Sequence, residues 1–208
     1  MIAWRPALWW GAFTGFYKPG VQDIKSLDNA SRFLYAARSV ILVISAQAAV
    51  IAGLLAINAG LFDLTNFICV LVGFVVAHMI SNLSNDYFGF RHGHDTPDSP
   101  RMRYTVHPLS GGVLDRRTLI TGLGLLAIVG LGIAAYFFAE RGWMAAAFFI
   151  AGVSLLFLYD AGPAPFKTIG LGELAVLLVW GPIMIGGGFA MITGQLSTNA
   201  MLASLPYG

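Results

Sequence analysis

Apolar and charged residues are sharply segregated along the chain. No charged residue interrupts five runs, which cover positions 40–62, 64–85, 118–139, 143–159 and 174–208. A helix needs about 20 predominantly apolar residues to cross the hydrocarbon core of a bilayer. The first three runs meet that length, and the fourth is slightly shorter. Because a chain in lipid must satisfy its backbone hydrogen bonds internally, the pattern predicts membrane-spanning helices.

The last run, 174–208, is too long for one ordinary helix. Its interior holds the polar stretch 194–199, Gly-Gln-Leu-Ser-Thr-Asn, which is typical of a turn. We therefore expect a fifth helix that ends near Thr193, followed by the beginning of a sixth. The predicted fold class is all-α: a polytopic transmembrane bundle with about five membrane-spanning helices plus the start of a sixth.

Composition agrees with this pattern. Hydrophobic residues make up 57% of the chain, charged residues 11%, and the mean hydropathy is +0.75. Soluble domains carry roughly 25% charged residues. We therefore expect an integral membrane protein whose surroundings are the lipid bilayer and whose partners include no nucleic acid. Cys69 is the only cysteine, and as a small apolar side chain it needs no role beyond packing.

The basic residues predict the orientation, because Lys and Arg accumulate in cytoplasmic loops. If five helices alternate, eleven of the twelve basic residues fall on one side, in segments 1–38, 86–117 and 160–173. The N-terminus and the 86–117 loop are therefore expected to be cytoplasmic, in a multi-pass protein of a bacterial or archaeal cell membrane. Residues 1–35 are aromatic and weakly basic, which favours an interfacial segment over a secretory signal.

Polar residues also form a stripe on the second predicted helix. His78, Asn82, Asn85, Asp86 and Gly89 follow one another at spacings of three or four, or lie directly beside such a position, so they share one helix face. Polar groups inside a membrane are costly and usually face a bundle interior or a watery cavity. Hydrogen bonding between helices is the simpler explanation for isolated polar residues such as His78, Gln47 and Asn58.

The stripe runs into a loop that is rich in aspartate and arginine. Carboxylates without nearby cysteine suit hard cations, and Mg²⁺ takes one or two carboxylates and completes its shell with phosphates and water. Arginines bind phosphate oxygens in bidentate fashion. The loop therefore predicts a diphosphate site at the membrane surface, beside a cavity for an apolar tail. Its candidate ligands are Asp86, Asp95 and Asp98, with Arg91, Arg101, Arg103, Arg116 and Arg117.

Two other interpretations of this loop stay open. His92, His94 and Asp95, together with His107, could bind Zn²⁺ through imidazole, although their spacing matches no defined zinc pattern. The loop could also be a solvated connector whose positive charges only set the topology. The second interpretation explains Arg116 and Arg117 but not the acidic residues.

The motifs resemble those of the UbiA-type intramembrane prenyltransferases, particularly the branch that contains 1,4-dihydroxy-2-naphthoate prenyltransferase. That branch carries an Asp-rich motif of the form N-x-x-N-D-Y-x-D-x-x-x-G-x-D-T after its second helix. The chain matches it at Asn82, Asn85, Asp86, Tyr87, Gly93, Asp95 and Thr96. The segment 159–188 is similar to the Tyr-x-x-x-Pro loop, Gly-Leu-Gly-Glu stretch and Gly-Pro helix of the same branch.

This resemblance implies Mg²⁺-dependent transfer of a prenyl group from a prenyl diphosphate to a small aromatic, lipid-quinone-precursor acceptor. It implies metal ligands at Asp86, Asp95 and Asn82, with Asp86 and Asp95 as the catalytic carboxylates. Asn82, Asn85, Arg101, Arg103, Tyr159 and Lys167 would then bind diphosphate or acceptor. Glu173 could equally stabilise a helix N-terminus.

The chain departs from the family pattern in two respects. Gly89 stands where the motif has its second carboxylate, and Asp95, Asp98 or water could fill that place. A second Asp-rich motif, expected beyond a sixth helix, is not reached by Gly208. The resemblance therefore implies that 36–208 is an incomplete prenyltransferase-like domain. A noncatalytic prenyl-lipid-binding or assembly subunit is the alternative, and a small membrane transporter is a third hypothesis.

Overall fold

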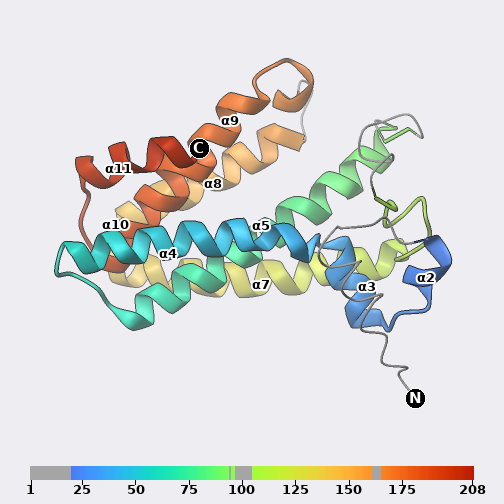
Figure 1. The fold of residues 1–208 in the computed structure, drawn as a ribbon, viewed down its shortest axis with the longest axis horizontal. Coiled ribbons are helices and arrows are strands. Elements are labelled where there is room, and N and C mark those ends of the chain that lie inside the picture. The colour runs from blue at the N-terminus through green and yellow to red at the C-terminus, as the bar shows by residue number, and fades with distance from the viewer. Residues whose placement is uncertain (1–19, 94, 97–104, 161–164) are drawn as a thin grey trace. The chain divides into compact units, whose positions relative to one another are not determined.

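In the computed structural model, helices and loops form every element of the described chain, which comprises residues 20–93, 95–96, 105–160 and 165–208. No strand occurs within these ranges. The predicted all-α fold is therefore confirmed (Figure 1).

Four helical segments are long and apolar enough to cross a membrane: Ser39–Asn58, Leu64–Arg91, Arg116–Arg141 and Gly172–Thr193. The predicted fourth span is a shorter apolar helix over Trp143–Tyr159. Thus four of the five expected spans reach the full length, and the one with the shortest apolar run does not. The individual elements are η1 (Ser39–Ile41), α4 (Leu42–Asn58), α5 (Leu64–Arg91), α7 (Arg116–Arg141), α8 (Trp143–Asp160), η2 (Phe166–Thr168), α9 (Gly172–Leu178), η3 (Val179–Gly186) and α10 (Gly187–Thr193).

The last predicted span ends as expected. Gly194 adopts φ 74°, a left-handed conformation that terminates α10 directly after Thr193. Inside the same span, η3 is a π-helical stretch that contains Pro182. Proline lacks the N–H of a regular helix and clashes with the preceding turn, which explains the local change of helical pitch. The chain then continues into α11 (Thr198–Ser204) and η4 (Leu205–Tyr207), which lie against η3.

The chain divides into two compact units, Met1–Val43 with His78–Ala127, and Ile44–Ala77 with Ile128–Gly208. In the first unit, α2 (Val21–Lys25) and α3 (Asn29–Ala36) lie beside the loop that leads into α7 (Figure 1). The hydroxyl of Tyr35 accepts a hydrogen bond from the Val106 N–H at 3.1 Å, which ties α3 to this loop. The buried apolar core of the unit includes Ile24, Leu27, Leu83, Val106, Val113, Leu114 and Leu119.

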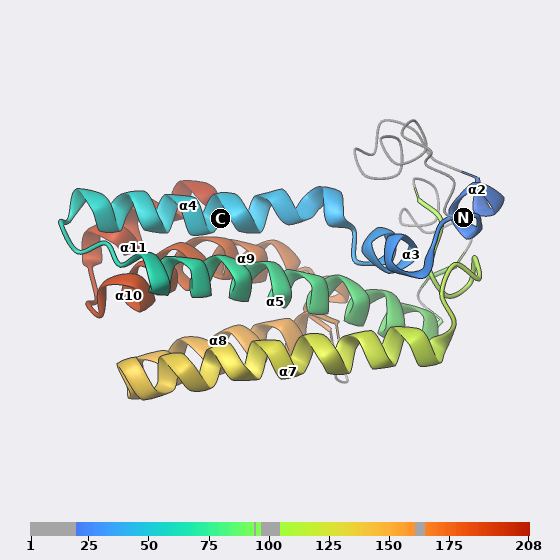
Figure 2. The ribbon, with the colours of Figure 1, turned by 90° about the horizontal axis from the view of Figure 1, so that it is seen from below.

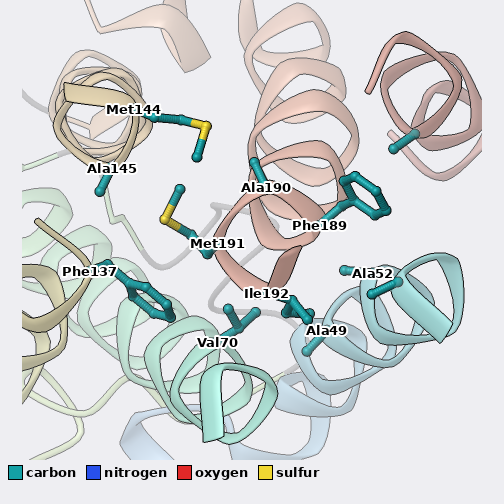
Figure 3. Packing of buried hydrophobic residues seen from close by; sticks show 12 residues of the cluster. Ala49, Ala52, Val70, Phe137, Met144, Ala145, Phe189, Ala190, Met191 and Ile192 are labelled. Carbon is teal, nitrogen blue, oxygen red and sulfur yellow. The ribbon is translucent and has the colours of Figure 1, made fainter. Parts of the chain in front are cut away.

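In the second unit, α4 and the first part of α5 form a helical hairpin, joined by a turn at Gly60 (Figure 2). Small side chains on α4 and α10 allow close helix packing, as lipid-embedded bundles require. A Cβ at Gly188 would lie only 3.1 Å from the Cβ of Ala52. Figure 3 shows Ala49 and Ala52 of α4 on the side that faces Phe189 and Ile192 of α10, and the same cluster includes Val70, Phe137 and Met191.

Candidate functional site

Asp86 is a buried carboxylate in the last turns of α5. Its side chain is 1% exposed, and its Oδ1 accepts a hydrogen bond from Nη2 of Arg38 at 2.5 Å. Removing an ionised carboxylate from water is costly unless it is paired and hydrogen-bonded. The guanidinium of Arg38 supplies the charge that this burial requires. Arg38 itself is 24% exposed, so the pair lies at the edge of the buried region.

The backbone of Arg38 is held in an unusual conformation. Its φ and ψ are 56° and 52°, and it is the only non-glycine residue with positive φ in the described ranges. The left-handed region costs an ordinary residue roughly 1–2 kcal/mol. The Arg38 N–H donates to Tyr35 O, and Arg38 O accepts from Ile41 N, both at 3.0 Å. This corner between α3 and η1 therefore directs the guanidinium toward Asp86 at a conformational cost, as is common at functional sites.

Asn82 lies one helical turn before Asp86 and is also buried. Its Nδ2 donates to Ala37 O at 2.9 Å, which fixes α5 against the residue that precedes Arg38. Because the partner is a carbonyl, the amide nitrogen must face it, and the amide oxygen is left as the atom that can accept or ligate. Asn85 is half-buried on the same stretch and has polar partners of its own.

The carboxylate of Asp95 lies directly over Gly89. The Asp95 N–H donates to Gly89 O at 3.3 Å, which folds the loop back onto the end of α5. A Cβ at position 89 would lie 2.1 Å from Oδ2 and 2.8 Å from Cγ of Asp95. Any side chain at 89 would therefore displace this carboxylate. The Asp95 carboxylate therefore lies in the space that a side chain at position 89 would enter.

His107 holds the other side of the Asp95 carboxylate. The imidazole is fully buried, and its Nε2 lies 3.1 Å from Oδ2 of Asp95. Its Nδ1 accepts the backbone N–H groups of Leu109 and Ser110 at 3.2 and 3.3 Å. A nitrogen that accepts two hydrogen bonds carries no proton, so the proton resides on Nε2. His107 is thus a neutral imidazole that donates to Asp95.

We refer to Asp86 and Asp95, whose carboxylates lie at or against neighbouring positions of α5, as the acidic cluster. Positions 86 and 89 are three residues apart on α5, and such positions place their Cβ atoms about 5–6 Å apart. The Asp95 carboxylate stands at the second of these positions. Arg38 donates to the Asp86 carboxylate, and the imidazole of His107 donates to the Asp95 carboxylate.

The second predicted loop lies in the second unit. A Cβ at Gly172 would lie 3.8 Å from Cε2 of Tyr159 and 3.6 Å from Cα of Lys167, so these two predicted residues flank the same glycine. Their part in substrate binding stays a prediction. Arg101, Arg103, Asp98 and His94 lie outside the described residues.

The zinc interpretation is not tested as a whole, because His94 lies outside the residues that the structure describes. They contain no group of three or more His, Cys, Asp or Glu side chains able to hold a metal. The ring of His92 stacks on Phe88 at 5.8 Å, whereas His107 is engaged by Asp95 and two backbone N–H groups. Near Gln47, the Tyr207 hydroxyl donates to Ile44 O at 2.7 Å and lies 3.4 Å from Oε1 of Gln47.

Sequence reasoning missed the partners of both carboxylates. The sequence places Arg38 only among the basic residues that indicate topology, and His107 only in the zinc interpretation. One signal for Arg38 is available in the sequence, because it is the last basic residue before the first apolar run, just as Asp86 directly follows the second. No comparable signal marks His107.

The fold and the cluster define a polytopic helical membrane protein with an acidic, arginine-supported site at the end of its second spanning helix. Residues 46–208 match the UbiA prenyltransferase family, and the chain belongs to that family.

Several characterised proteins are similar to the chain. The 1,4-dihydroxy-2-naphthoate octaprenyltransferase of Bacillus subtilis is 28% identical over 149 residues, which cover 69% of this chain and 45% of the relative. The protein of the same name from Escherichia coli is 26% identical over 193 residues, covering 88% and 61%. The UbiA prenyltransferase domain-containing protein 1 of Xenopus tropicalis is 27% identical over 152 residues, covering 72% and 42%.

The chain spans about half the length of the first of these curated relatives. No solved structure shows significant similarity to it.

Proposed function

We propose that this protein transfers a prenyl group from a prenyl diphosphate to a small aromatic acceptor within the membrane, with Mg²⁺ as cofactor. The observation that carries the proposal is the acidic cluster, in which Asp86 lies on α5 and the Asp95 carboxylate of the following loop lies against position 89 of the same helix. Membership of the UbiA prenyltransferase family supports the same reaction class.

The residues present fit a hard divalent cation. The candidate ligands are the carboxylates of Asp86 and Asp95 and the amide oxygen of Asn82, all of them oxygen donors as Mg²⁺ prefers. When bound, Mg²⁺ would stabilise the negative charge that develops on a departing diphosphate.

The protein groups themselves would bind and orient the substrate. Arg38 lies against Asp86 and offers a guanidinium, whose planar fork suits phosphate oxygens. Cleavage of the allylic C–O bond leaves negative charge on the diphosphate, which positively charged groups stabilise as it forms. The buried amide of Asn82 donates to Ala37 O and so holds α5 next to Arg38. This contact keeps the Asp86 carboxylate close to the Arg38 guanidinium.

The acceptor is inferred from the relatives. Those from Bacillus subtilis and Escherichia coli are named for 1,4-dihydroxy-2-naphthoate and an octaprenyl chain. We propose an aromatic acceptor of that type, which places the reaction in menaquinone biosynthesis. The electron-rich ring would attack the prenyl carbocation and then lose a proton.

The test uses protein from the complete coding sequence, reconstituted in nanodiscs with geranylgeranyl diphosphate, 1,4-dihydroxy-2-naphthoate and Mg²⁺. Release of diphosphate and formation of the prenylated naphthoate are expected. Asp86→Asn should lower kcat by on the order of 10²-fold or more. The substitution removes a negative charge from the proposed metal site, which stabilises the departing diphosphate. Glu140→Gln, an exposed carboxylate in the second unit, is the matched control and should keep full activity. Absence of turnover with prenyl diphosphates of several lengths would overturn the proposal, as would an undiminished Asp86→Asn.

A further inference from the structure

We infer that His107 is a positioning residue, which holds the Asp95 carboxylate in the space that Gly89 leaves open and so completes the acidic cluster. This inference rests on the proposed function, since it concerns the metal-binding carboxylates. It assigns to His107 and Gly89 a joint role: the glycine provides the room, and the imidazole directs the carboxylate into it.

The imidazole is oriented from its own side of the loop. Nδ1 receives the N–H groups of Leu109 and Ser110, so the ring cannot turn without leaving two backbone donors unsatisfied. The Gly111 N–H donates to His107 O at 2.9 Å, and the Tyr35 hydroxyl holds Val106. These hydrogen bonds fix the turn that carries His107, and this turn orients the Nε2–H toward Asp95.

Gly89 is the complementary half of the arrangement. With a Cβ there at 2.1 Å from Oδ2, the carboxylate could not remain against α5. The Asp95 N–H bond to Gly89 O brings the residue to the helix, and His107 then selects the position of its side chain. Asp95, which belongs to the loop, thereby supplies the carboxylate that the family motif places at position 89 of the helix.

The two nitrogens of His107 separate a positioning role from a purely structural one. In His107→Asn, the side-chain oxygen can replace Nδ1 as acceptor for Leu109 and Ser110, but no donor reaches Asp95. In His107→Gln, the longer amide can donate to Asp95 in place of Nε2, while the acceptor at the Nδ1 position is lost. A role confined to stabilising the turn predicts that Gln is the damaging substitution, whereas positioning of Asp95 predicts that Asn is.

The experiment measures Mn²⁺ binding by electron paramagnetic resonance, with inorganic diphosphate present, on the complete protein in nanodiscs. Groups that orient metal ligands typically contribute 10–100-fold to metal affinity. We expect about 10–100-fold weaker Mn²⁺ binding in His107→Asn and recovery of most of the affinity in His107→Gln. Unchanged affinity in His107→Asn, or a greater loss in His107→Gln, would overturn the inference.

Two variants at position 89 keep the test decisive if the histidine variants fail to fold. Gly89→Ala and Gly89→Asp introduce the same Cβ and displace Asp95 equally, but only the second brings a new carboxylate. Mn²⁺ affinity should fall in Gly89→Ala and be restored in Gly89→Asp, and equal behaviour of the two would refute the inference.

Asp86→Asn distinguishes failure of this inference from failure of the proposed metal site. If it abolishes Mn²⁺ binding while the position 89 and 107 variants bind normally, only this inference fails. If Asp86→Asn also binds normally, the proposed metal site fails with it.

Discussion

Arg38 and Asp86 form a buried ion pair across 48 positions of sequence, with Nη2 of the guanidinium 2.5 Å from Oδ1 of the carboxylate. The pair joins the corner after α3 to the end of α5, and it lies beside the residues proposed to bind metal. Because the Asp86 carboxylate is buried, this pair is the first contact to test.

Arg38→Gln should destabilise the protein, because it removes the guanidinium that pairs with the buried Asp86 carboxylate. Removing one member of a buried pair typically costs about 3–5 kcal/mol. The double variant Arg38→Gln with Asp86→Asn should recover much of this loss, since no buried charge remains. Thermal unfolding in nanodiscs of the two single variants and the double variant measures the coupling. Additive effects in this cycle would show that the pair contributes nothing beyond its separate members.

Asn82→Leu should impair both stability and catalysis. The substitution leaves Ala37 O without its donor, and an unsatisfied buried polar group costs about 1–3 kcal/mol. It also removes the amide oxygen proposed as a metal ligand. We therefore expect a lower melting temperature and a higher Mg²⁺ concentration for half-maximal activity. Leu83→Ile, at the neighbouring buried position, is the control and should leave the Mg²⁺ dependence unchanged. The same unchanged dependence in Asn82→Leu would remove this residue from the metal site.

Asp115 should make the stability of the first unit pH-dependent. The pKa of its carboxyl is lowered by hydrogen bonds from the backbone N–H and the hydroxyl of Thr118, where it caps α7. Because the folded-state pKa lies below the unfolded one, its contribution is present above the unfolded pKa, about 3.9. That contribution is lost as pH falls through the folded pKa.

Melting temperatures of wild type and Asp115→Asn, compared between neutral and acidic pH, test this directly. Asparagine keeps an oxygen to accept from Thr118 but carries no charge. The variant should melt below the wild type at neutral pH, and the difference should shrink as the carboxylate becomes protonated in the wild type. A constant difference over the whole pH range would contradict the assignment.

Gly188→Val should destabilise the helix packing of the second unit. A Cβ there would lie 3.0 Å from Phe74 and 3.1 Å from Ala52, so valine must push apart α4, α5 and α10. Overpacking of this kind typically costs about 1–3 kcal/mol. Gly132→Val is the matched control, since nothing lies within 4 Å of a Cβ at that position of α7. Resistance to denaturation in detergent should fall only in the first variant, and equal behaviour would refute the packing argument.

The long helices could be predicted from the sequence because the bilayer imposes a simple rule. Uncharged runs of sufficient length must form hydrogen-bonded helices in lipid, and this identified the four full-length spans and the end of α10 near Thr193. The same reasoning singled out Asp86 and Asn82, because a polar stripe inside such a helix needs a reason. The short apolar run of α8 explains why that prediction was the weakest of the five.

The tertiary structure alone decided which groups meet those residues. The spacing of residues in a helix follows from its own geometry, but the partner of a buried charge depends on how distant segments fold onto it. Arg38 reaches Asp86 through a left-handed corner that its own sequence does not favour. Asp95 reaches Gly89 only because the loop turns back and His107 meets it there. The sequence by itself therefore determined the helices and the first carboxylate, while the path of the loop determined how the second carboxylate is supplied.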